Sequence, residues 1–521
     1  MTELVKTQVF FDQSVGRENV QIMLEGDLIV PDVKPDMALL LQTEERIVIE
    51  RTEAGTDRVN YMGHLDVSVL YVAKDPGKSV QSIQVTRGLD DFVNMEGVAK
   101  DMWVRMGADI VNIDYRLVND RKVNYRAVVN LSVTAESSHG HEMVVHINDV
   151  PENQLLKRDL QVNRTIDHRA DRFQIKEPLT LPAAKPNIRE VLQTAVSIAS
   201  RDVRMANGRV NLSGELLLTA LYRGDTEDSL IELMEWEIPF NGAIDVPGAR
   251  EDMLADALLQ VLGQQTTLRP DDDGEDRVLE VEVLVGVEMK VYSGEALQVL
   301  EDAYSINRQM EFVKTEVRYP QLVCLNRNQV SVKEVVTLGG NSPDMLQIFR
   351  AKGQAHVDDV RIIDDKIIAE GAINTHILYV AESDAMPLSG YHTVIPFRQV
   401  IEAKGAAPGM DVHLDASIDH VTFNMLSPRE TEVRFQLTFN TQVVSQEALA
   451  IIDHVDIVDI LPEVLTNQAS MTVYIVQDGD NLWKIAKKYN MPLDELISIN
   501  ELENPGKIAP GQKLLMLKRG M

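Results

Sequence analysis

Two groups of side chains have the composition, though not the spacing, of metal sites. Residues 271–276 read Asp-Asp-Asp-Gly-Glu-Asp, and His139, His141 and His146 lie near one another in the sequence. The acidic run lacks the alternating ligands and the downstream glutamate of an EF-hand, and the histidines do not form the HExxH pattern of a zinc-binding helix. We therefore predict a solvated hairpin loop at 271–276, a polar loop between strands at 139–146, and no metal site.

The sequence contains few candidate catalytic groups. Cys324 is the only cysteine, and its apolar neighbours are typical of a small buried residue rather than a reactive thiol. One cysteine allows neither a disulfide nor a Cys-rich zinc site within the chain. The sequence has no Walker A loop, no dinucleotide fingerprint and no G-x-S-x-G elbow. We predict a protein that is not an enzyme and needs no cofactor. A wall hydrolase stays open as a third hypothesis, because carboxylate pairs in β-folds leave no readable motif.

The charge balance excludes some partners. The 521 residues include 51 Lys and Arg against 81 Asp and Glu, a net charge of −30. A surface this acidic repels phosphate backbones, so nucleic-acid binding is not expected. The N-terminus lacks the pattern of a secretory signal, and no stretch of about 18 apolar residues could form a transmembrane segment. We expect the protein to stay in the compartment where it is made.

The C-terminal residues 472–521 differ from the rest of the chain. They contain seven basic and six acidic residues, so their net charge is +1 and that of the preceding residues is −31. Their pattern predicts a strand, a Gly479-Asp480 turn, two short amphipathic helices and a final strand. Either Asp480 or Asn481 is placed to cap the first helix.

This pattern resembles a LysM domain. The resemblance rests on Tyr474, Val476, Gly479, Asp480, Leu482, Trp483, Ile485, Ala486, Tyr489, Leu496, Asn500, Leu502, Ile508, Gly511, Gln512 and Leu514. It implies a βααβ fold that binds N-acetylglucosamine polymers such as peptidoglycan, in a groove between the loop after the first strand and the loop before the last. The predicted binding residues are Gly479, Asp480, Asn481, Leu482, Trp483, Lys507, Ile508, Ala509 and Pro510. The family commonly has threonine where this chain has Asn481.

Two of these predictions have simpler structural alternatives. Trp483 is predicted as an exposed aromatic anchor for a partner, because tryptophan is enriched at binding hot spots, or as a cover for the small core of this unit. The run Ile508–Pro510 either lines the groove or sets the turn into the last strand. The residue types alone leave both alternatives open.

The chain before this unit contains three copies of one module. Each copy has a glycine, a tyrosine eight residues later, and a proline 28 residues before the glycine. The copies are separated by 151 and 157 residues, which indicates tandem domains with their own cores rather than a solenoid. The marker residues are Pro35, Gly63 and Tyr71; Pro186, Gly214 and Tyr222; and Pro343, Gly371 and Tyr379.

Within each module the hydrophobic pattern indicates β-structure. Leu65, Val67 and Val69 alternate with polar residues, as in a sheet with one solvated face. The glycine is predicted to allow a bulge or a close backbone approach, and the tyrosine to cover the buried face. The predicted fold class is therefore mainly β: tandem sandwich-like modules with short helices, followed by a small α+β domain. The short helices are predicted at Met37–Gln42, Ile188–Gln193 and Met345–Arg350.

Three β-rich modules ahead of a LysM-like unit resemble the SipL family, whose members carry SPOCS modules (DUF3794) and a C-terminal LysM domain. The predicted domains are SPOCS-like modules at 1–165, 166–315 and 316–450, a linker at 451–471 and a LysM domain at 472–521.

The resemblance implies a non-enzymatic scaffold of endospore coat assembly. In that function the LysM domain binds the spore-coat ATPase SpoIVA, and the β-modules localise the protein or contact other coat proteins. The implied location is the mother-cell cytoplasm, with recruitment to the forespore surface. The alternative is a peptidoglycan-binding protein of the cortex or cell wall. The lack of a secretory signal favours the scaffold, since a LysM domain that stays in the cytoplasm does not meet the wall.

Overall fold

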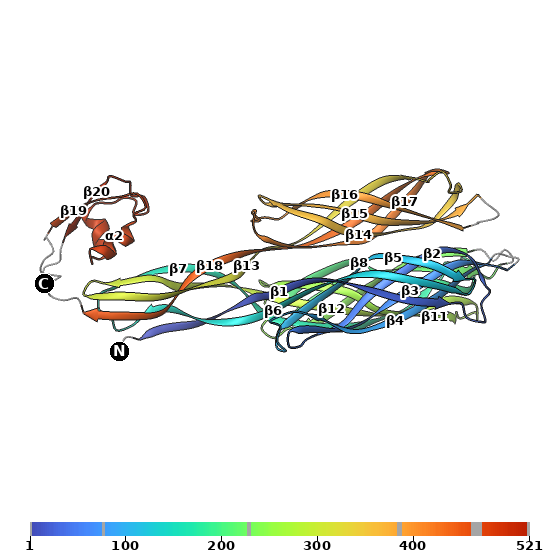
Figure 1. The fold of residues 1–521 in the computed structure, drawn as a ribbon, viewed down its shortest axis with the longest axis horizontal. Coiled ribbons are helices and arrows are strands. Elements are labelled where there is room, and N and C mark those ends of the chain that lie inside the picture. The colour runs from blue at the N-terminus through green and yellow to red at the C-terminus, as the bar shows by residue number, and fades with distance from the viewer. Residues whose placement is uncertain (1–2, 76–78, 227–230, 383–387, 460–470, 518–521) are drawn as a thin grey trace.

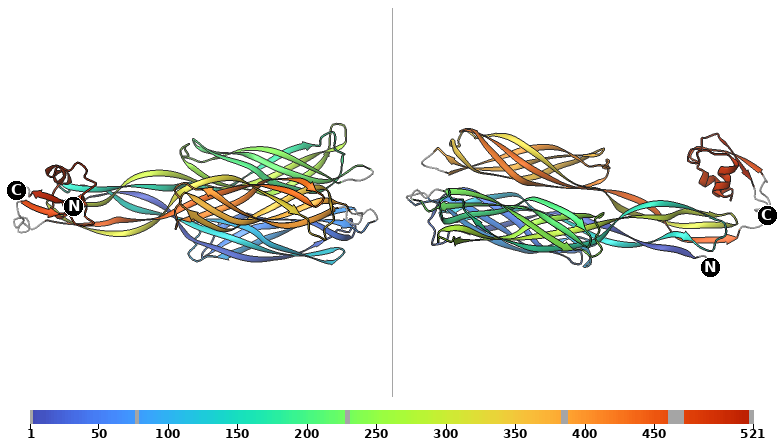
Figure 2. Two further views of the ribbon diagram at one scale, coloured as in Figure 1. Left: turned by 90° about the horizontal axis from the view of Figure 1, so that it is seen from above. Right: turned by 180° about the vertical axis from the view of Figure 1, so that it is seen from behind.

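The computed structural model describes residues 3–75, 79–226, 231–382, 388–459 and 471–517. The molecule is elongated, with β-sheets gathered at one end and long strands continuing from them as a narrow stalk (Figures 1 and 2). The C-terminal unit lies beside the far end of the stalk, near the N-terminus (Figure 1). The mainly-β fold class is confirmed.

Each module is a sandwich of two three-stranded antiparallel sheets with the same strand order. One sheet holds the module's first, sixth and fifth strands, and the other holds the second, third and fourth. The first module has β1 (Leu4–Ile29), β2 (Met37–Ala54), β3 (Arg58–Ala73), β4 (Val80–Asn94), β5 (Trp103–Asn119) and β6 (Lys122–Ile147). The second has β7 (Asn153–Thr180), β8 (Ile188–Ala206), β9 (Arg209–Gly224), β10 (Ile231–Asp245), β11 (Leu254–Pro270) and β12 (Asp276–Ser305). The third has β13 (Arg308–Thr337), β14 (Met345–Ile363), β15 (Lys366–Ala381), β16 (Leu388–Glu402), β17 (Asp411–Ser427) and β18 (Glu430–Asp459).

The alternating residues of the middle strands form the sandwich cores, as predicted. Leu65 and Val67 of β3 are fully buried and belong to one core with Val129 and Leu131 of β6 in the facing sheet. The second and third modules have corresponding cores of their own. Thr375 is the polar exception on the buried face of β15, and its hydroxyl donates to the carbonyl oxygen of Ile373 at 3.2 Å.

The recurring glycine lies where two backbones approach closely. A Cβ atom on Gly63 would stand 2.1 Å from the carbonyl oxygen of Val48. The same clash, at 2.1 and 2.0 Å from a facing carbonyl oxygen, would occur at Gly214 and Gly371. The pairing register shifts in the facing strand beside all three glycines. A β-bulge therefore brings the facing backbone too near for any side chain, which confirms the predicted role of the glycine.

The recurring tyrosine is bonded to the recurring proline. The buried ring of Tyr71 directs its hydroxyl to the carbonyl oxygen of Pro35, to which it donates at 2.9 Å. The same bond joins Tyr222 to Pro186 at 3.3 Å and Tyr379 to Pro343 at 3.1 Å. The spacing between proline and tyrosine is thus constant because the same length of chain joins the proline loop to the strand whose tyrosine holds it.

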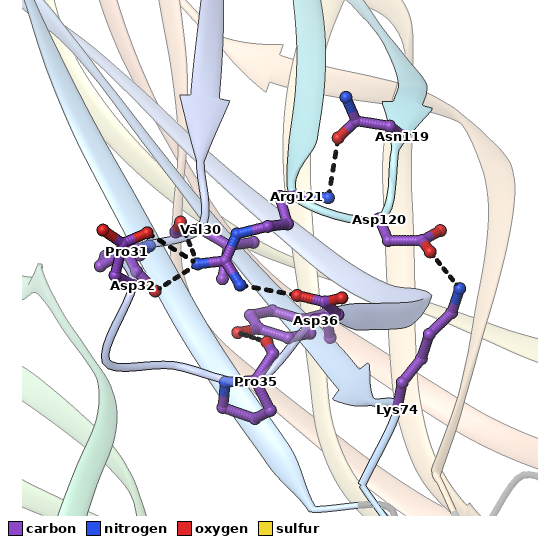
Figure 3. A network of polar contacts seen from close by, with 10 residues as sticks. Val30, Pro31, Asp32, Pro35, Asp36, Lys74, Asn119, Asp120 and Arg121 are labelled. Carbon is purple, nitrogen blue, oxygen red and sulfur yellow. Dashed lines mark hydrogen bonds and ion pairs between the residues drawn. The ribbon is translucent and has the colours of Figure 1, made fainter.

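An arginine that the sequence analysis missed fixes the same loop. Arg121, at the turn between β5 and β6, donates to Asp36 at 2.6 Å and to the carbonyl oxygens of Val30 at 3.1 Å and Pro31 at 2.9 Å (Figure 3). Arg277 makes the corresponding bonds to Pro182 and Asn187, and Arg429 to Gly339 and Asp344. Arg277 follows its proline by 91 residues and the other two by 86, which conceals the repeat in the sequence.

The three helices predicted inside the modules are wrong. Met37–Gln42, Ile188–Gln193 and Met345–Arg350 are the beginnings of strands β2, β8 and β14. Each stretch contains two register shifts, which in the first module lie between Met37 and Leu39 and between Leu40 and Gln42. Bulges replace the two-residue alternation of a strand with a spacing of buried residues that resembles a helix.

The prediction for the acidic run is confirmed, and that for the histidine group is not. Residues 271–275 form the loop between β11 and β12 and Asp276 begins β12; in this loop the Asp271 carboxylate accepts from the N–H groups of Asp273 and Glu275 at 3.0 Å each. The hairpin-loop prediction is confirmed. The polar loop predicted at 139–146 is wrong, because these residues lie in β6 and pair with β1. The strand continues there because β6 extends beyond its sandwich into the stalk.

Equivalent residues of the three modules meet where the modules pack against one another. Leu41, Leu70, Val72, Val80, Leu192, Leu221 and Leu388 form one buried cluster that joins the three modules. Gln42, Gln193 and Arg350, seven residues after their prolines, line a cavity of about 10 Å³ beside it. In the stalk, Val9, Phe11, Met143, Leu160, Val162, Val299, Val317, Tyr319, Leu449 and Ile451 form a second shared core. The modules are therefore packed against one another rather than strung loosely.

Strand ends place the divisions between modules near 148–152 and 306–307. The predicted boundaries after residues 165 and 315 fall inside β7 and β13. Of the linker predicted at 451–471, residues 451–459 belong to β18, residues 460–470 lie outside the described residues, and Met471 begins the next strand.

Cys324 is half-buried in β13 and packs against the core of the third module, and burial raises the pKa of its thiol.

Candidate functional site

The C-terminal unit folds as a strand, two helices and a strand. β19 (Met471–Ile475) pairs antiparallel with β20 (Lys513–Leu517), and α2 (Leu482–Lys488) and α3 (Leu493–Ile499) connect them. Ile485, Ala486, Leu496 and Leu514 are almost fully buried in its core. Turns with positive φ at Gly479, at +82°, and at Gly511 allow the chain to leave β19 and to enter β20.

The loop after β19 has two polar residues with separate roles. Asn481 is the N-cap of α2, and its side-chain oxygen accepts from the N–H of Lys484 at 2.8 Å. Asp480 closes the preceding turn, accepting from the N–H of Gln477 and from the hydroxyl of Tyr474 at 2.8 Å each. These bonds lower the pKa of Asp480 and raise that of Tyr474. Of the two residues that could cap the helix, Asn481 does so, a task that asparagine shares with threonine.

The two predicted binding loops are held side by side. The N–H of Val476 donates to the carbonyl oxygen of Gln512 at 2.9 Å, and the N–H of Gly511 donates back to Val476 at 2.8 Å. These bonds bring the loop after β19 next to the loop before β20. Of the predicted site residues, Gly479, Asn481, Lys507, Ala509 and Pro510 are exposed, Asp480, Trp483 and Ile508 are half-buried, and Leu482 is buried in the core.

Comparison with protein families agrees with this division of the chain. The model described as "SipL, SPOCS domain" matches residues 36–118, 187–263 and 344–426, and that described as "LysM domain" matches residues 474–516. This chain carries three SipL SPOCS domains and one LysM domain. Each SPOCS match begins directly after the recurring proline and lies within the second to fifth strands of its module. The stalk strands β1, β6, β7, β12, β13 and β18 lie outside the matched segments.

Curated relatives resemble only short parts of the chain. "SpoIVD-associated factor A" of Bacillus subtilis is 44% identical over 52 residues, which are 10% of this chain and 13% of the relative. "Spore coat assembly protein ExsA" of Bacillus cereus is 53% identical over 45 residues, 8% of this chain and 7% of the relative. The uncharacterised protein YkzQ of B. subtilis is 34% identical over 58 residues, 11% of this chain and 76% of the relative. No solved structure matches the chain.

The face of α2 that carries Trp483 is in contact with the stalk. The indole N–H of Trp483 donates to the carboxylate of Asp302 at 2.8 Å, and the ammonium group of Lys487 donates to the same carboxylate at 2.6 Å. The rings of Trp483 and Tyr304 meet edge to face, with centroids 4.9 Å apart. Trp483 therefore covers part of the LysM core and also contacts another domain, a combination that the two sequence alternatives did not include.

Tyr304 completes this contact from the end of β12. Its hydroxyl donates to the backbone carbonyl oxygen of Met491, between α2 and α3, at 2.8 Å. Burial under the LysM domain raises the pKa of Tyr304. Lys487 also lies over the ring of Phe312, 5.1 Å from its centroid. We call Asp302, Tyr304 and Phe312 the stalk seat.

Sequence reasoning missed the stalk seat. Its one available signal was that Asp302 and Tyr304 have no counterparts of the same type in the other modules, which is visible only after strand pairing aligns them.

Among the described residues, no group of three or more His, Cys, Asp or Glu side chains is arranged to hold a metal ion. Within the same part of the chain, no helix is long and apolar enough to cross a membrane.

Proposed function

We propose that this protein is a non-enzymatic scaffold of endospore coat assembly that captures the coat ATPase SpoIVA through its LysM domain. The SPOCS body acts as a rigid mount that contacts other coat proteins. The protein works in the mother-cell cytoplasm and is recruited from there to the forespore surface.

The observation that carries the proposal is the architecture: three SPOCS domains packed into one body that presents a LysM domain at the end of its stalk. The B. cereus relative is named as a spore coat assembly protein, which supports this function. The net charge of −31 before residue 472 argues against an anionic partner surface for the body, whereas the LysM region carries +1. Both matched families are binding or scaffold domains, which supports a non-enzymatic function.

Fluorescent tagging during sporulation tests this function in the cell. The full chain should form a ring around the forespore, and a chain that ends before residue 472 should remain diffuse in the mother cell. Export of the full chain, or a ring that persists without the LysM domain, would contradict the proposal.

Peptidoglycan binding is the second candidate, favoured by the two exposed loops that lie side by side around Asn481 and Pro510. A pull-down of the full chain on purified peptidoglycan and, separately, on SpoIVA distinguishes the candidates. Pro510→Glu places a charge between the loops, and Lys513→Glu, on the neighbouring strand, is the matched control. Retention on the wall that Pro510→Glu abolishes, together with no capture of SpoIVA, would reverse our order.

A further inference from the structure

We propose that the LysM domain has two states: a docked state on the stalk seat, and a released state in which the Trp483 face of α2 takes a protein partner. The identity of the partner rests on the proposed function. The docked state rests on the contacts of this chain alone. The stalk seat is thus an interaction surface whose resident occupant is the chain's own LysM domain.

Two of the three seat residues, Asp302 and Tyr304, are specific to the second SPOCS domain, and Phe312 comes from β13 of the third. The three stalk ribbons have the same construction, so strand pairing identifies equivalent positions at their ends. His146 and His454 stand where the second domain has Asp302, and Asn148 and Asp456 stand where it has Tyr304. An exposed histidine at the first position supplies no permanent carboxylate for Lys487 and the Trp483 indole, and the second position lacks an aromatic ring. Only one of the three ribbon ends therefore matches the donors of α2.

The contact is strong enough to hold a tethered domain and small enough to release it. Asp302 has a side chain only 19% exposed and accepts two hydrogen bonds, one of them from a cation, which makes them stronger than bonds between neutral groups. The Trp483–Tyr304 pair adds an edge-to-face aromatic contact. The LysM domain and its seat belong to the same chain, so docking is intramolecular and a weak interface is sufficient for it.

The docked state distinguishes two classes of ligand. Gly479, Asn481, Ala509 and Pro510 stay exposed while the domain is docked, so a glycan that enters between the loops needs no rearrangement. A protein that binds Trp483 must first remove it from Asp302 and Tyr304. The affinity of such a partner is reduced by the fraction of molecules that are docked.

Docking is tested with the full chain and its variants by NMR. Amide signals of a docked LysM domain relax with the whole 58.4 kDa chain, whereas those of a released domain stay sharp. We expect broad signals for the wild type and sharp signals for Asp302→Lys and for Tyr304→Ala, which remove independent contacts. The matched control is His146→Lys, the same charge at the equivalent end of the first ribbon. Sharp LysM signals in the wild type, or release by the control variant to the same extent, would overturn the docked state.

A carbodiimide cross-link gives an independent measurement, because Lys487 and Asp302 are already paired. The expected product is a link within one chain that disappears in Asp302→Lys. A link found only between two chains would show that the seat takes the LysM domain of a second copy, and would overturn the intramolecular assignment.

Binding measurements test whether the stalk seat and SpoIVA compete for the Trp483 face of α2. SpoIVA should bind Asp302→Lys at least about fivefold more tightly than the wild type, and a soluble N-acetylglucosamine hexamer should bind both forms equally. Equal SpoIVA affinities would overturn the competition. If neither form binds SpoIVA, the proposed partner is wrong and the competition falls with it, while the NMR and cross-linking results still decide the docked state.

Discussion

The interior of each SPOCS domain and the surfaces between the domains are built differently. Inside, the same residue types make the same contacts three times, as Gly63, Tyr71 and Arg121 do in the first domain. Between domains, the apolar contacts recur but the polar ones do not: Lys290 of the second domain is paired with Asp12 and Glu136 of the first, and the other domains lack such a lysine. The fold of one domain therefore depends on repeated contacts, and the assembly of three depends on side chains that occur once.

The largest loss of stability is expected when a contact that recurs inside all three SPOCS domains is disrupted. Gly63→Ala places a methyl group 2.1 Å from the carbonyl oxygen of Val48, and the β-bulge has to open to admit it. We expect a loss of about 3 kcal/mol in the free energy of unfolding, measured by urea denaturation. Gly88→Ala is the matched control, because Gly88 lies on the neighbouring strand and its new Cβ meets nothing within 4 Å. Equal stability of the two variants would contradict the close-approach explanation.

Removal of the arginine that fixes the proline loop should cause the next largest loss of stability. Arg121→Met removes a guanidinium group that holds Asp36 and two backbone carbonyl groups, of which only that of Pro31 has a further backbone donor, the N–H of Lys34. A loss of about 2 kcal/mol is expected, since the site is partly exposed to solvent. Arg121→Lys keeps the charge but not the planar fork, and should lose a large part of the same stability. Full stability of the lysine variant would show that charge alone, not the fork, holds the loop.

These two cases mark what the sequence could predict. The Gly, Tyr and Pro markers were found because they keep constant spacing. The glycine has the close backbone approach that was expected and the tyrosine is buried as expected, but its bond to the proline was not predicted. Arg121 was missed because its counterpart Arg277 is displaced by a longer acidic turn, and the strands at Met37–Gln42 were mistaken for helices because their bulges are tertiary features. The LysM fold could be predicted from residues local in sequence. The stalk seat could not, because Asp302 and Trp483 are 181 residues apart and neither recurs.

A position where the three domains differ should give a pH-dependent effect. His376 occupies the place of Ser68 and Thr219, between Lys352 and His392, and burial, Lys352 and His392 lower its pKa to about 4. The unfolded chain binds a proton near pH 6.5 that the folded protein does not accept until about pH 4, so stability falls as the pH decreases through this interval.

The matched variant is His376→Thr, which installs the residue of the second domain. Because His376 keeps some contact with solvent, we expect the wild type to lose about 1–2 kcal/mol more than the variant between pH 7 and pH 4. Thermal unfolding at several pH values measures this difference. Parallel pH profiles of the two proteins would show that His376 is protonated normally in the folded state.

The smallest effect is expected in the LysM domain, which occurs once and has no repeated partner. Asn481→Ala removes the N-cap of α2 and should lower the local stability of this domain by about 1 kcal/mol, because the N–H of Lys484 loses its acceptor. Hydrogen exchange of the α2 amides measures the loss, and exchange in β3 and β9 should not change. Asn481→Thr keeps a capping oxygen and should retain most of the protection. If Asn481→Thr weakens ligand binding while α2 stays protected, Asn481 contacts the ligand directly, whereas equal binding by both proteins would limit its role to capping the helix.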